Sequence, residues 1–301
     1  MNEPAKKFIL HFVTPLENVS PFDVNMAADS GFDIIVPYSG VTLAGVAALV
    51  QDAIFSRAPA DGARTAMLIG GRDPLLALDM LEAAKQAMVP PYFEISVMAD
   101  PSGAFTTAAG MVAVVEQRLR AKGRGLEGVR IAVFGATGPV GGVAGLIAAQ
   151  AGAEVTLVGY DGLERVAARC KLLGERFGVG LQAADGSDDA KKQAIVEATE
   201  VILAAGRAST QILSKAQLAK AGSLLVALDV NAVPPAGLEG VDAFADGIAI
   251  EGTGGIGIGA LPVGNVKFKT EHQLLASMRD ASPRRSIGVA EAFAVAREHA
   301  G

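Results

Sequence analysis

The chain has 301 residues, of which half are hydrophobic and 19% are charged, and it contains 36 glycines. This length exceeds what one hydrophobic core usually supports, so we expect two domains of about 120 to 170 residues each. The composition is typical of globular α/β proteins and excludes a disordered chain. The net charge of −6, with no cluster of basic and aromatic residues, argues against nucleic-acid binding.

Cysteine and histidine are scarce in this chain. Cys170 is the single cysteine and lies in a helical pattern, where we expect a small buried thiol. His11, His272 and His299 have no metal-ligand spacing, so we expect no metal site. The N-terminus has too short an apolar run for a signal peptide, and no stretch reaches the roughly 18 apolar residues of a membrane span. We therefore expect a cytoplasmic protein that binds no membrane, and we expect a homo-oligomer.

Strand and helix patterns alternate through the first part of the chain. The predicted strands are 7–13, 32–37, 65–69 and 95–99, and the predicted helices are 21–30, 42–55, 73–87 and 106–121. Such alternation predicts a parallel sheet covered by helices on both faces. The segment 122–128, with three glycines and several charges, interrupts the pattern and is interpreted as a domain boundary.

The same alternation restarts after this segment. The predicted strands are 129–134, 154–158, 180–183, 201–204 and 224–227, and the predicted helices are 139–151, 162–177 and 188–198. A last helix, 286–298, is expected to return to the first domain. The prediction is thus an α/β protein with two domains: an N-terminal α/β substrate domain (1–125 plus about 274–301) and a Rossmann-type doubly wound parallel sheet (126–273).

The sequence GATGPVG at 135–141 follows an apolar strand and opens a helix, which is the context of a dinucleotide-binding turn. Glycines let backbone amides approach a pyrophosphate, and the helix N-terminus adds unpaired N–H groups and a partial positive charge. Pro139 suits the first helical turn because it lacks an N–H. The candidate cofactor-binding residues in this turn are Gly135, Thr137, Gly138, Pro139, Val140 and Gly141.

The next predicted strand ends in Gly159-Tyr160-Asp161, and Asp161 lies 20 residues beyond Gly141. An acid at this distance commonly accepts hydrogen bonds from the adenosine ribose hydroxyls and repels a 2′-phosphate, which favours NAD over NADP. Arg165 lies near enough to offer a counter-charge, and Asp161 is also a candidate N-cap of the following helix. We therefore expect Tyr160 and Asp161 to contact NAD or NADP, with a preference for NAD.

Further candidate cofactor-binding residues follow later strands. Ala205 and Gly206, and then Asp229 and Asn231, lie at predicted carboxyl ends of strands, where such sheets bind ligands near the nicotinamide end. Ordinary turn chemistry is the alternative explanation. The run 252–259 contains five glycines, including Gly257, and is expected to close over the cofactor or to line a cleft between domains; a flexible connector is the alternative.

Several longer motifs resemble one known family nearly end to end. They are SPFDV at 20–24, IGG at 69–71, FTTAA at 105–109, GATGPVG at 135–141, DVNAVPPAG at 229–237, and GIGIGAL at 255–261 with GNVK at 264–267. The chain resembles the NAD(P)-dependent methylenetetrahydromethanopterin dehydrogenases of methylotrophic bacteria. The absence of an Arg at 160 and the acid at 161 resemble the branch that accepts NAD as well as NADP.

The resemblance implies oxidation of methylenetetrahydromethanopterin to its methenyl form, with hydride transfer to NAD(P), during formaldehyde oxidation. Such a reaction needs placement of the carbon about 3–3.5 Å from the nicotinamide and tolerance of a developing cation, rather than a general base. Asp23 occupies the family's Ser-x-Phe-Asp position and is expected to contact the pterin or the cation; a helix-terminal acid is the alternative. Lys267 matches the family's active-site lysine.

The neighbouring positions are weaker candidates. Asp100, Thr106 and Thr107 are candidate substrate-binding residues, although both threonines also suit helix capping. Lys269 is a less suitable lysine than Lys267. A branch of the family has a histidine four residues after that lysine, whereas His272 comes five residues after it, so we expect no direct role for His272.

Two other functions remain open at this point. A methylenetetrahydrofolate dehydrogenase or a shikimate dehydrogenase would share the architecture, although their motifs are not found here. A protein of another class, a non-catalytic sensor of NAD(P)H, would keep the dinucleotide site and tolerate changes at Asp23 and Lys267.

Overall fold

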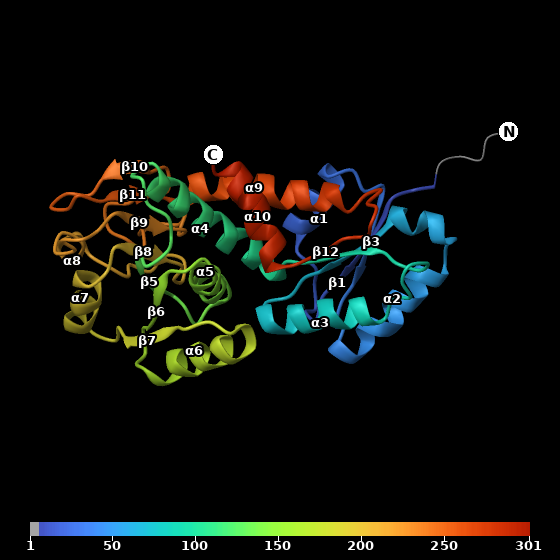
Figure 1. The fold of residues 1–301 in the computed structure, drawn as a ribbon, viewed down its shortest axis with the longest axis horizontal. Helices are drawn as coiled ribbons and strands as arrows, with labels where there is room; N and C mark the ends of the chain where they lie inside the picture. Colours follow the sequence, from blue (N-terminus) through green and yellow to red (C-terminus); the bar gives the residue numbers. More distant parts are fainter. Residues whose placement is uncertain (1–5) are drawn as a thin grey trace. The chain divides into compact units, whose positions relative to one another are not determined.

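The computed structural model describes residues 6–301 (Figure 1). The first five residues of the predicted N-terminal domain lie outside the described residues. The chain divides into two compact units. Unit 1 comprises the chain up to Thr106 and Phe268–Val295, and unit 2 comprises Thr107–Lys267 and Ala296–Gly301.

Unit 1 is built on a five-stranded sheet with the order β12-β4-β3-β1-β2, in which every neighbouring pair is parallel. Its strands are β1 (Ile9–Val13), β2 (Ile34–Tyr38), β3 (Thr65–Ile69), β4 (Ser96–Ala99) and β12 (Ser286–Ile287). The chain adds β2 on one side of β1 and then β3 and β4 on the other. The order therefore reverses between β1 and β3, as in doubly wound folds.

The helices of unit 1 have sequence signals at their first residues. They are α1 (Pro21–Asp29), α2 (Val46–Phe55) and α3 (Pro74–Gln86), together with parts of α4 (Ala104–Arg120), α9 (Ala260–Ser277) and α10 (Val289–His299). Proline occupies the first turn of α1 and α3, and the side chains of Ser20 and Asp73 accept backbone N–H groups as N-caps. Helices α1 and α3 thus begin where a cap and a proline coincide, whereas α2 has no side-chain cap.

Unit 2 holds a seven-stranded sheet with the order β10-β11-β9-β8-β5-β6-β7. Its strands are β5 (Arg130–Phe134), β6 (Glu154–Gly159), β7 (Gln182–Asp185), β8 (Val201–Ala204), β9 (Val226–Asp229), β10 (Asp246–Ala249) and β11 (Ile256–Ile258). All neighbouring pairs are parallel except β10 with β11. The central strands β5, β8 and β9 are almost entirely buried, which explains their continuous apolar sequences.

Helices pack on this sheet along the chain. They are α5 (Pro139–Gln150), α6 (Glu164–Phe177), α7 (Asp189–Glu197) and the short α8 (Lys215–Leu218). Helix α5 packs on β5 and β6, and α6 packs on β6 and β7. Cys170 of α6 is buried and free, as predicted for a small apolar side chain. The two doubly wound parallel sheets confirm the predicted fold class.

The largest difference from the sequence-based elements is α9. The sequence patterns predicted no helix or strand after the glycine run 252–259 until residue 286. Residues 256–258 instead form strand β11, and the 18-residue helix α9 follows. Its buried residues Val263, Val266, Thr270 and Leu274 recur at helical spacing. Pro262 lies in the first helical turn, where a missing N–H costs little.

The division into units also differs from the predicted boundary at 125/126. It falls between Thr106 and Thr107, inside α4, and twice more inside α9 and α10. The segment 122–128 interrupts the helical pattern, but the preceding 17-residue helix already extends from one unit into the other. Within the described residues, no helix is long and apolar enough to cross a membrane.

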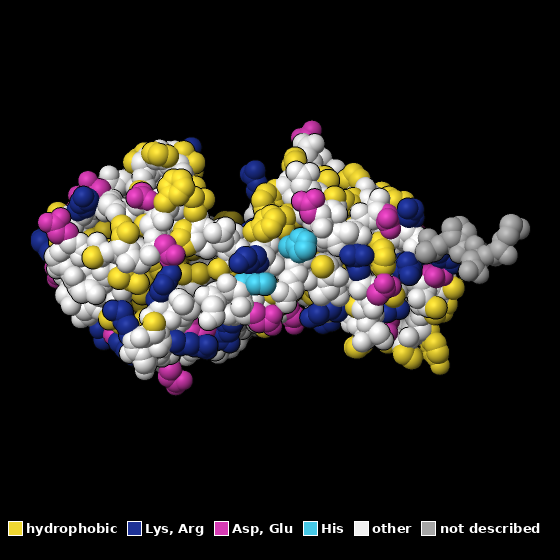
Figure 2. Space-filling model, turned by 90° about the horizontal axis from the view of Figure 1, so that it is seen from above, with side chains coloured by type: hydrophobic (Ala, Val, Ile, Leu, Met, Phe, Trp, Pro, Cys, Tyr) yellow, Lys and Arg dark blue, Asp and Glu magenta, His cyan; other side chains and the backbone are white. Residues whose placement is uncertain are grey.

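On the face drawn in Figure 2, acidic and basic side chains of the described residues are interspersed. The basic side chains on this face do not gather into one patch.

Candidate functional site

Several predicted cofactor residues lie at one edge of the sheet in unit 2. After β5 the chain adds β6 and β7 on one side and then crosses to β8 and β9 on the other. The strand order therefore reverses between β5 and β8, and ligands of doubly wound sheets bind outside the carboxyl ends of the strands at such a point. The glycine turn follows β5, Ala205-Gly206 follows β8, and Tyr160-Asp161 lies at the end of β6.

The glycine turn is packed too tightly for side chains. Gly135 has φ +79°, and a Cβ atom there would lie 2.3 Å from the carbonyl oxygen of Ala205. A Cβ atom on Gly141 would lie 2.6 Å from the carbonyl oxygen of Gly135. The backbone N–H of Gly138 donates to the carbonyl of Gly135 at 3.0 Å. Both approaches need glycine: the first brings the turn against the segment after β8, and the second brings it against the first turn of α5.

The N-terminus of α5 has no side chain over it. Gly138 is the N-cap and offers no side-chain acceptor, and Pro139 occupies the first helical position. The early N–H groups of α5 are thus left without a side-chain cap and carry the partial positive charge of the helix end. A Cβ atom on Gly145 would lie 2.6 Å from Leu157 Cδ2, so this glycine lets α5 pack closely on β6. This arrangement suits an anionic ligand.

Asp161 lies beside an arginine rather than at a helix cap. Arg165 Nη1 is 2.5 Å from Asp161 Oδ2 and donates to the Tyr160 hydroxyl at 3.2 Å. The hydrogen bond to Asp161 is the main cause that raises the pKa of Arg165. Helix α6 begins at Glu164 with Leu163 as N-cap and has no side-chain cap bond, so the capping alternative for Asp161 is not observed. The acid is left about one-third exposed, with its side chain 31% accessible.

Asp229 and Asn231 hold their own loop. Asp229 is 1% exposed, and its two oxygens accept the backbone N–H groups of Asn231 at 2.9 Å and Leu238 at 3.0 Å. Burial raises the pKa of Asp229, while hydrogen bonds from the loop amides lower it. Asn231 Nδ2 donates to the carbonyl of Pro235 at 3.0 Å. These contacts match the turn-chemistry alternative, and contact with a cofactor stays a prediction.

Gly206 and Gly257 have packing reasons of their own. A Cβ atom on Gly206 would lie 2.6 Å from Ile212 Cδ1, and one on Gly257 would lie 2.9 Å from Val241 Cγ2. Gly257 is buried in β11, which pairs with β9 and β10, and is therefore not part of an open loop. The structure thus places Gly257 in a strand of the sheet rather than in the flexible connector that was the alternative.

The candidate acids of unit 1 are buried. Asp23 is 5% exposed and lies in the first turn of α1. Asp100 directly follows β4, and its Oδ1 accepts the backbone N–H of Phe105 at 2.8 Å. Its Oδ2 accepts the hydroxyl of Thr106 at 2.5 Å. Asp100, rather than either threonine, therefore accepts the backbone N–H groups at the start of α4, and Thr107 is half-buried.

Lys267 lies on α9 and is half-buried, whereas Lys269 is exposed. One turn further, His272 Nε2 lies 3.3 Å from the carbonyl oxygen of Asp29, and its ring stacks on Phe268 with a centroid distance of 6.5 Å. Both contacts of His272 lie within unit 1, and the absence of a direct role stays a prediction.

Sequence reasoning missed Arg169 of α6, whose Nη2 donates to the carbonyl of Thr137 in the glycine turn at 3.4 Å. Arg169 shares a helix face with the buried residues Val166 and Leu173, at spacings of three and four. A charged residue on the apolar face of an amphipathic helix is the sequence signal that would have found it.

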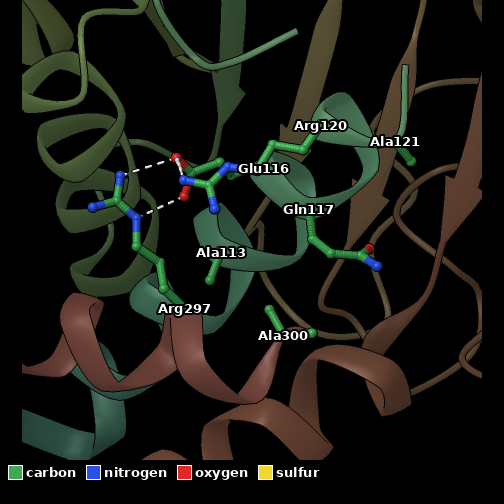
Figure 3. A pocket seen from close by; sticks show the side chains of 8 residues that line it. Ala113, Glu116, Gln117, Arg120, Ala121, Arg297 and Ala300 are labelled. Carbon is green, nitrogen blue, oxygen red and sulfur yellow. Dashed lines mark hydrogen bonds and ion pairs between the residues drawn. The ribbon is translucent and has the colours of Figure 1, made fainter. Parts of the chain in front are cut away.

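A separate cavity of about 260 Å³ lies in unit 2, between α4 and the last residues of the chain (Figure 3). The side chain of Glu116 is 7% exposed and accepts Arg297 Nε at 2.6 Å, Arg297 Nη2 at 3.0 Å and Arg120 Nη2 at 2.9 Å. Both carboxylate oxygens are thus engaged by arginine. The described residues contain no group of three potential ligands that could hold a metal ion.

Comparison with known proteins decides the family. The chain is 47% identical over 294 residues to the NAD(P)-dependent methylenetetrahydromethanopterin dehydrogenase of Methylorubrum extorquens, covering 97% of this chain and 99% of that protein. The chain belongs to this dehydrogenase family. A family model described as methylene-tetrahydromethanopterin dehydrogenase, N-terminal, matches residues 21–102, which include Asp23 and Asp100.

A second relative and two solved structures are less similar to this chain. The "Bifunctional protein MdtA" of the same organism is 33% identical over 92% of this chain and 94% of its own length. A malic enzyme from Thermotoga maritima has a TM-score of 0.53 at 13% identity, covering 96% of this chain and 84% of its own. A shikimate 5-dehydrogenase from Listeria monocytogenes has a TM-score of 0.50 at 12% identity, covering 98% and 99%. These two structures support the fold alone.

Proposed function

We propose that this chain oxidises methylenetetrahydromethanopterin to methenyltetrahydromethanopterin and transfers the hydride to NAD or NADP. The observation that carries the proposal is the 47% identity to a dehydrogenase of that name over nearly the whole chain. In the reaction, the bridging CH₂ between two nitrogens loses a hydride, and the positive charge left behind is shared by both nitrogens. The nicotinamide accepts that hydride, so no proton has to be removed and no general base is needed.

The cofactor fits the edge of the sheet in unit 2. Gly135 and Gly141 leave no room for a Cβ atom, so the backbone can lie directly against a pyrophosphate, and the uncapped start of α5 offers N–H groups to it. The proposed pyrophosphate contacts are Gly135, Thr137, Gly138, Pro139, Val140 and Gly141. Tyr160 and Asp161 would take the adenosine ribose, and Ala205, Gly206, Asp229, Asn231 and Gly257 would lie toward the nicotinamide.

NAD is the preferred nucleotide in this proposal. Asp161 keeps 31% of its side chain exposed, so it can accept hydrogen bonds from the ribose hydroxyls. Its ion pair with Arg165 reduces the repulsion of a 2′-phosphate, which is consistent with acceptance of NADP as the second nucleotide.

Lys267 and Asp23 are the proposed catalytic residues. A buried carboxylate stabilises a nearby cation more strongly than an exposed one, because water screens it less, and Asp23 is 5% exposed. Lys267 would hydrogen-bond the pterin and orient it. Asp100, Thr106 and Thr107 are proposed to contact the polar edge of the pterin, although the first two already support the start of α4.

The proposal includes the setting of the reaction. We propose a homo-oligomer in the cytoplasm that acts in one-carbon metabolism, where formaldehyde is oxidised in methylotrophic growth. The N-terminal domain (1–125 with about 274–301) would bind the pterin, and residues 126–273 would bind the dinucleotide without a metal.

Turnover tests the proposal against its rivals. Purified protein is mixed with methylenetetrahydromethanopterin or methylenetetrahydrofolate and with NAD or NADP, and the absorbance of reduced nicotinamide and methenyl pterin is followed. Activity with the methanopterin substrate supports the proposal. Activity with the folate alone would replace it with a folate dehydrogenase, and binding of NAD(P)H without turnover on either pterin would indicate a sensor.

Variants separate catalysis from nucleotide binding. Lys267→Ala and Asp23→Asn should each lower kcat by about 10²-fold or more while leaving NADH affinity unchanged. Lys269→Ala is the matched control, since it removes an exposed lysine from the same helix and should keep full activity. Equal activity of Lys267→Ala and Lys269→Ala would remove Lys267 from the proposed site.

A further inference from the structure

We propose that Arg169 of α6 binds the 2′-phosphate of NADP and so lets one site accept both nucleotides. This inference rests on the proposed function, because it assigns a residue of the same dinucleotide site. It concerns a side chain that lies eight residues beyond Asp161 in the sequence and yet reaches the glycine turn.

Arg169 lies against the glycine turn and belongs to the helix that follows Asp161. On one side, Nη2 donates to the carbonyl of Thr137 in the glycine turn at 3.4 Å. A Cβ atom on Gly142 would lie 3.5 Å from Arg169 Nε, so the bare backbone of α5 lets the guanidinium approach. On the other side, α6 itself begins just after Asp161 at the end of β6. A phosphate on the ribose would lie in this region.

The guanidinium has unused hydrogen-bonding capacity. Arginine carries five N–H donors, and within residues 6–301 the bond to Thr137, which is long and hence weak, is the one that Arg169 makes. No acid of the described residues forms an ion pair with it. A half-buried cation without a counter-ion is costly, and a phosphate would offer both the negative charge and two oxygen atoms that can accept a forked pair of hydrogen bonds.

Arg165, the obvious alternative, is already engaged. It contacts Asp161 at 2.5 Å and the Tyr160 hydroxyl at 3.2 Å, and its side chain is 59% exposed. Its charge is therefore largely compensated by Asp161, and of these two arginines Arg169 is the one that forms no ion pair within residues 6–301. The ion pair of Arg165 with Asp161 reduces the repulsion between Asp161 and a 2′-phosphate, and Arg169 attracts that phosphate.

Titration of the whole protein with NADH and NADPH, followed by nicotinamide fluorescence without any pterin, tests this assignment. Arg169→Met should weaken NADPH binding by about tenfold or more and NADH binding by no more than about twofold. Arg169→Lys should restore part of the NADPH affinity, because it keeps the charge but loses the forked geometry. Lys171→Met is the control: it removes one positive charge from the same helix at a side chain 75% exposed, and should leave both affinities unchanged.

The outcomes of this titration distinguish a failure of the Arg169 assignment from a failure of the proposed function on which it rests. A similar loss of NADH and NADPH affinity in Arg169→Met would overturn it, since the arginine would then serve the pyrophosphate or the turn itself. An equal NADPH loss in Lys171→Met would overturn it as well, because long-range charge would explain the effect. Failure of the unchanged protein to bind either nucleotide would overturn the proposed function and this inference together.

Discussion

Replacement of Gly135 by alanine tests whether the glycine turn is built by close backbone approach. Two costs are expected at this position. The φ of +79° is left-handed, and a residue with a Cβ atom pays roughly 1–2 kcal/mol there. The Cβ atom would also lie 2.3 Å from the carbonyl oxygen of Ala205, whereas ordinary contact begins at 3.4 Å, so the two backbones must separate by about 1 Å.

Gly128→Ala is the matched control, because it has the first cost without the second. Its φ is +66°, and a Cβ atom there would meet nothing within 4 Å. Urea unfolding followed by circular dichroism should show a loss of roughly 1–2 kcal/mol for Gly128→Ala. Gly135→Ala should lose about 1–3 kcal/mol more, as overpacked sites do.

Nucleotide binding completes this test. A displacement of about 1 Å at the turn should weaken NADH binding by at least about tenfold in Gly135→Ala, because the amides no longer converge on the pyrophosphate. NADH affinity should be unchanged in Gly128→Ala. If both variants lose the same stability and both keep NADH affinity, the close approach of Gly135 to Ala205 does not shape a nucleotide site.

Three further substitutions test the acids. Asp161→Asn should lower the ratio of NADPH to NADH dissociation constants by about tenfold or more, since a repelling charge and a ribose acceptor are removed; an unchanged ratio would exclude Asp161 from the ribose site. Asp229→Asn should lower the unfolding free energy by about 1–3 kcal/mol, because the NH₂ group of the asparagine would face a backbone N–H donor. Wild-type stability of this variant would contradict the idea that the two carboxylate oxygens hold the loop. Burial raises the pKa of Glu200, but hydrogen bonds from Arg124 and the backbone N–H of Arg130 bring it below its ordinary value. The Glu200 carboxylate therefore stabilises the fold fully above about pH 4.5, and this stabilisation is lost as the pH falls through the lower folded-state pKa. Glu200→Gln should accordingly reduce the dependence of the unfolding free energy on pH in the acid range. An unchanged dependence would contradict the ion pairs of Glu200 with Arg124 and Arg130.

The sequence predicted the parts of the fold that depend on local patterns. Alternating apolar strands and helices indicated both parallel sheets, and the proximity of Arg165 to Asp161 in the sequence indicated a positive charge near the predicted ribose site. Helix α9 was missed because Gly264 and Pro262 are typical of loops, although the buried positions from Val263 onward keep helical spacing.

The contacts that depend on distant segments were not predictable in this way. Asp229 holds Leu238, nine residues away, and only the folded loop shows that both carboxylate oxygens are used. Arg169 reaches Thr137, which lies 32 residues earlier, because α5 and α6 pack on neighbouring strands of one sheet. Single-sequence patterns report the face of a helix but not the backbone that lies opposite it.

Transfer of an isotopic label tests the central claim most directly. The protein is given methylenetetrahydromethanopterin in which both hydrogens of the bridging carbon are replaced by deuterium, together with NAD, and the mass of the nicotinamide product is measured. Direct hydride transfer predicts one deuterium in the reduced nicotinamide and none exchanged into water. Reduced nicotinamide without deuterium, or oxidation of the pterin with no reduction of NAD, would contradict the proposed reaction.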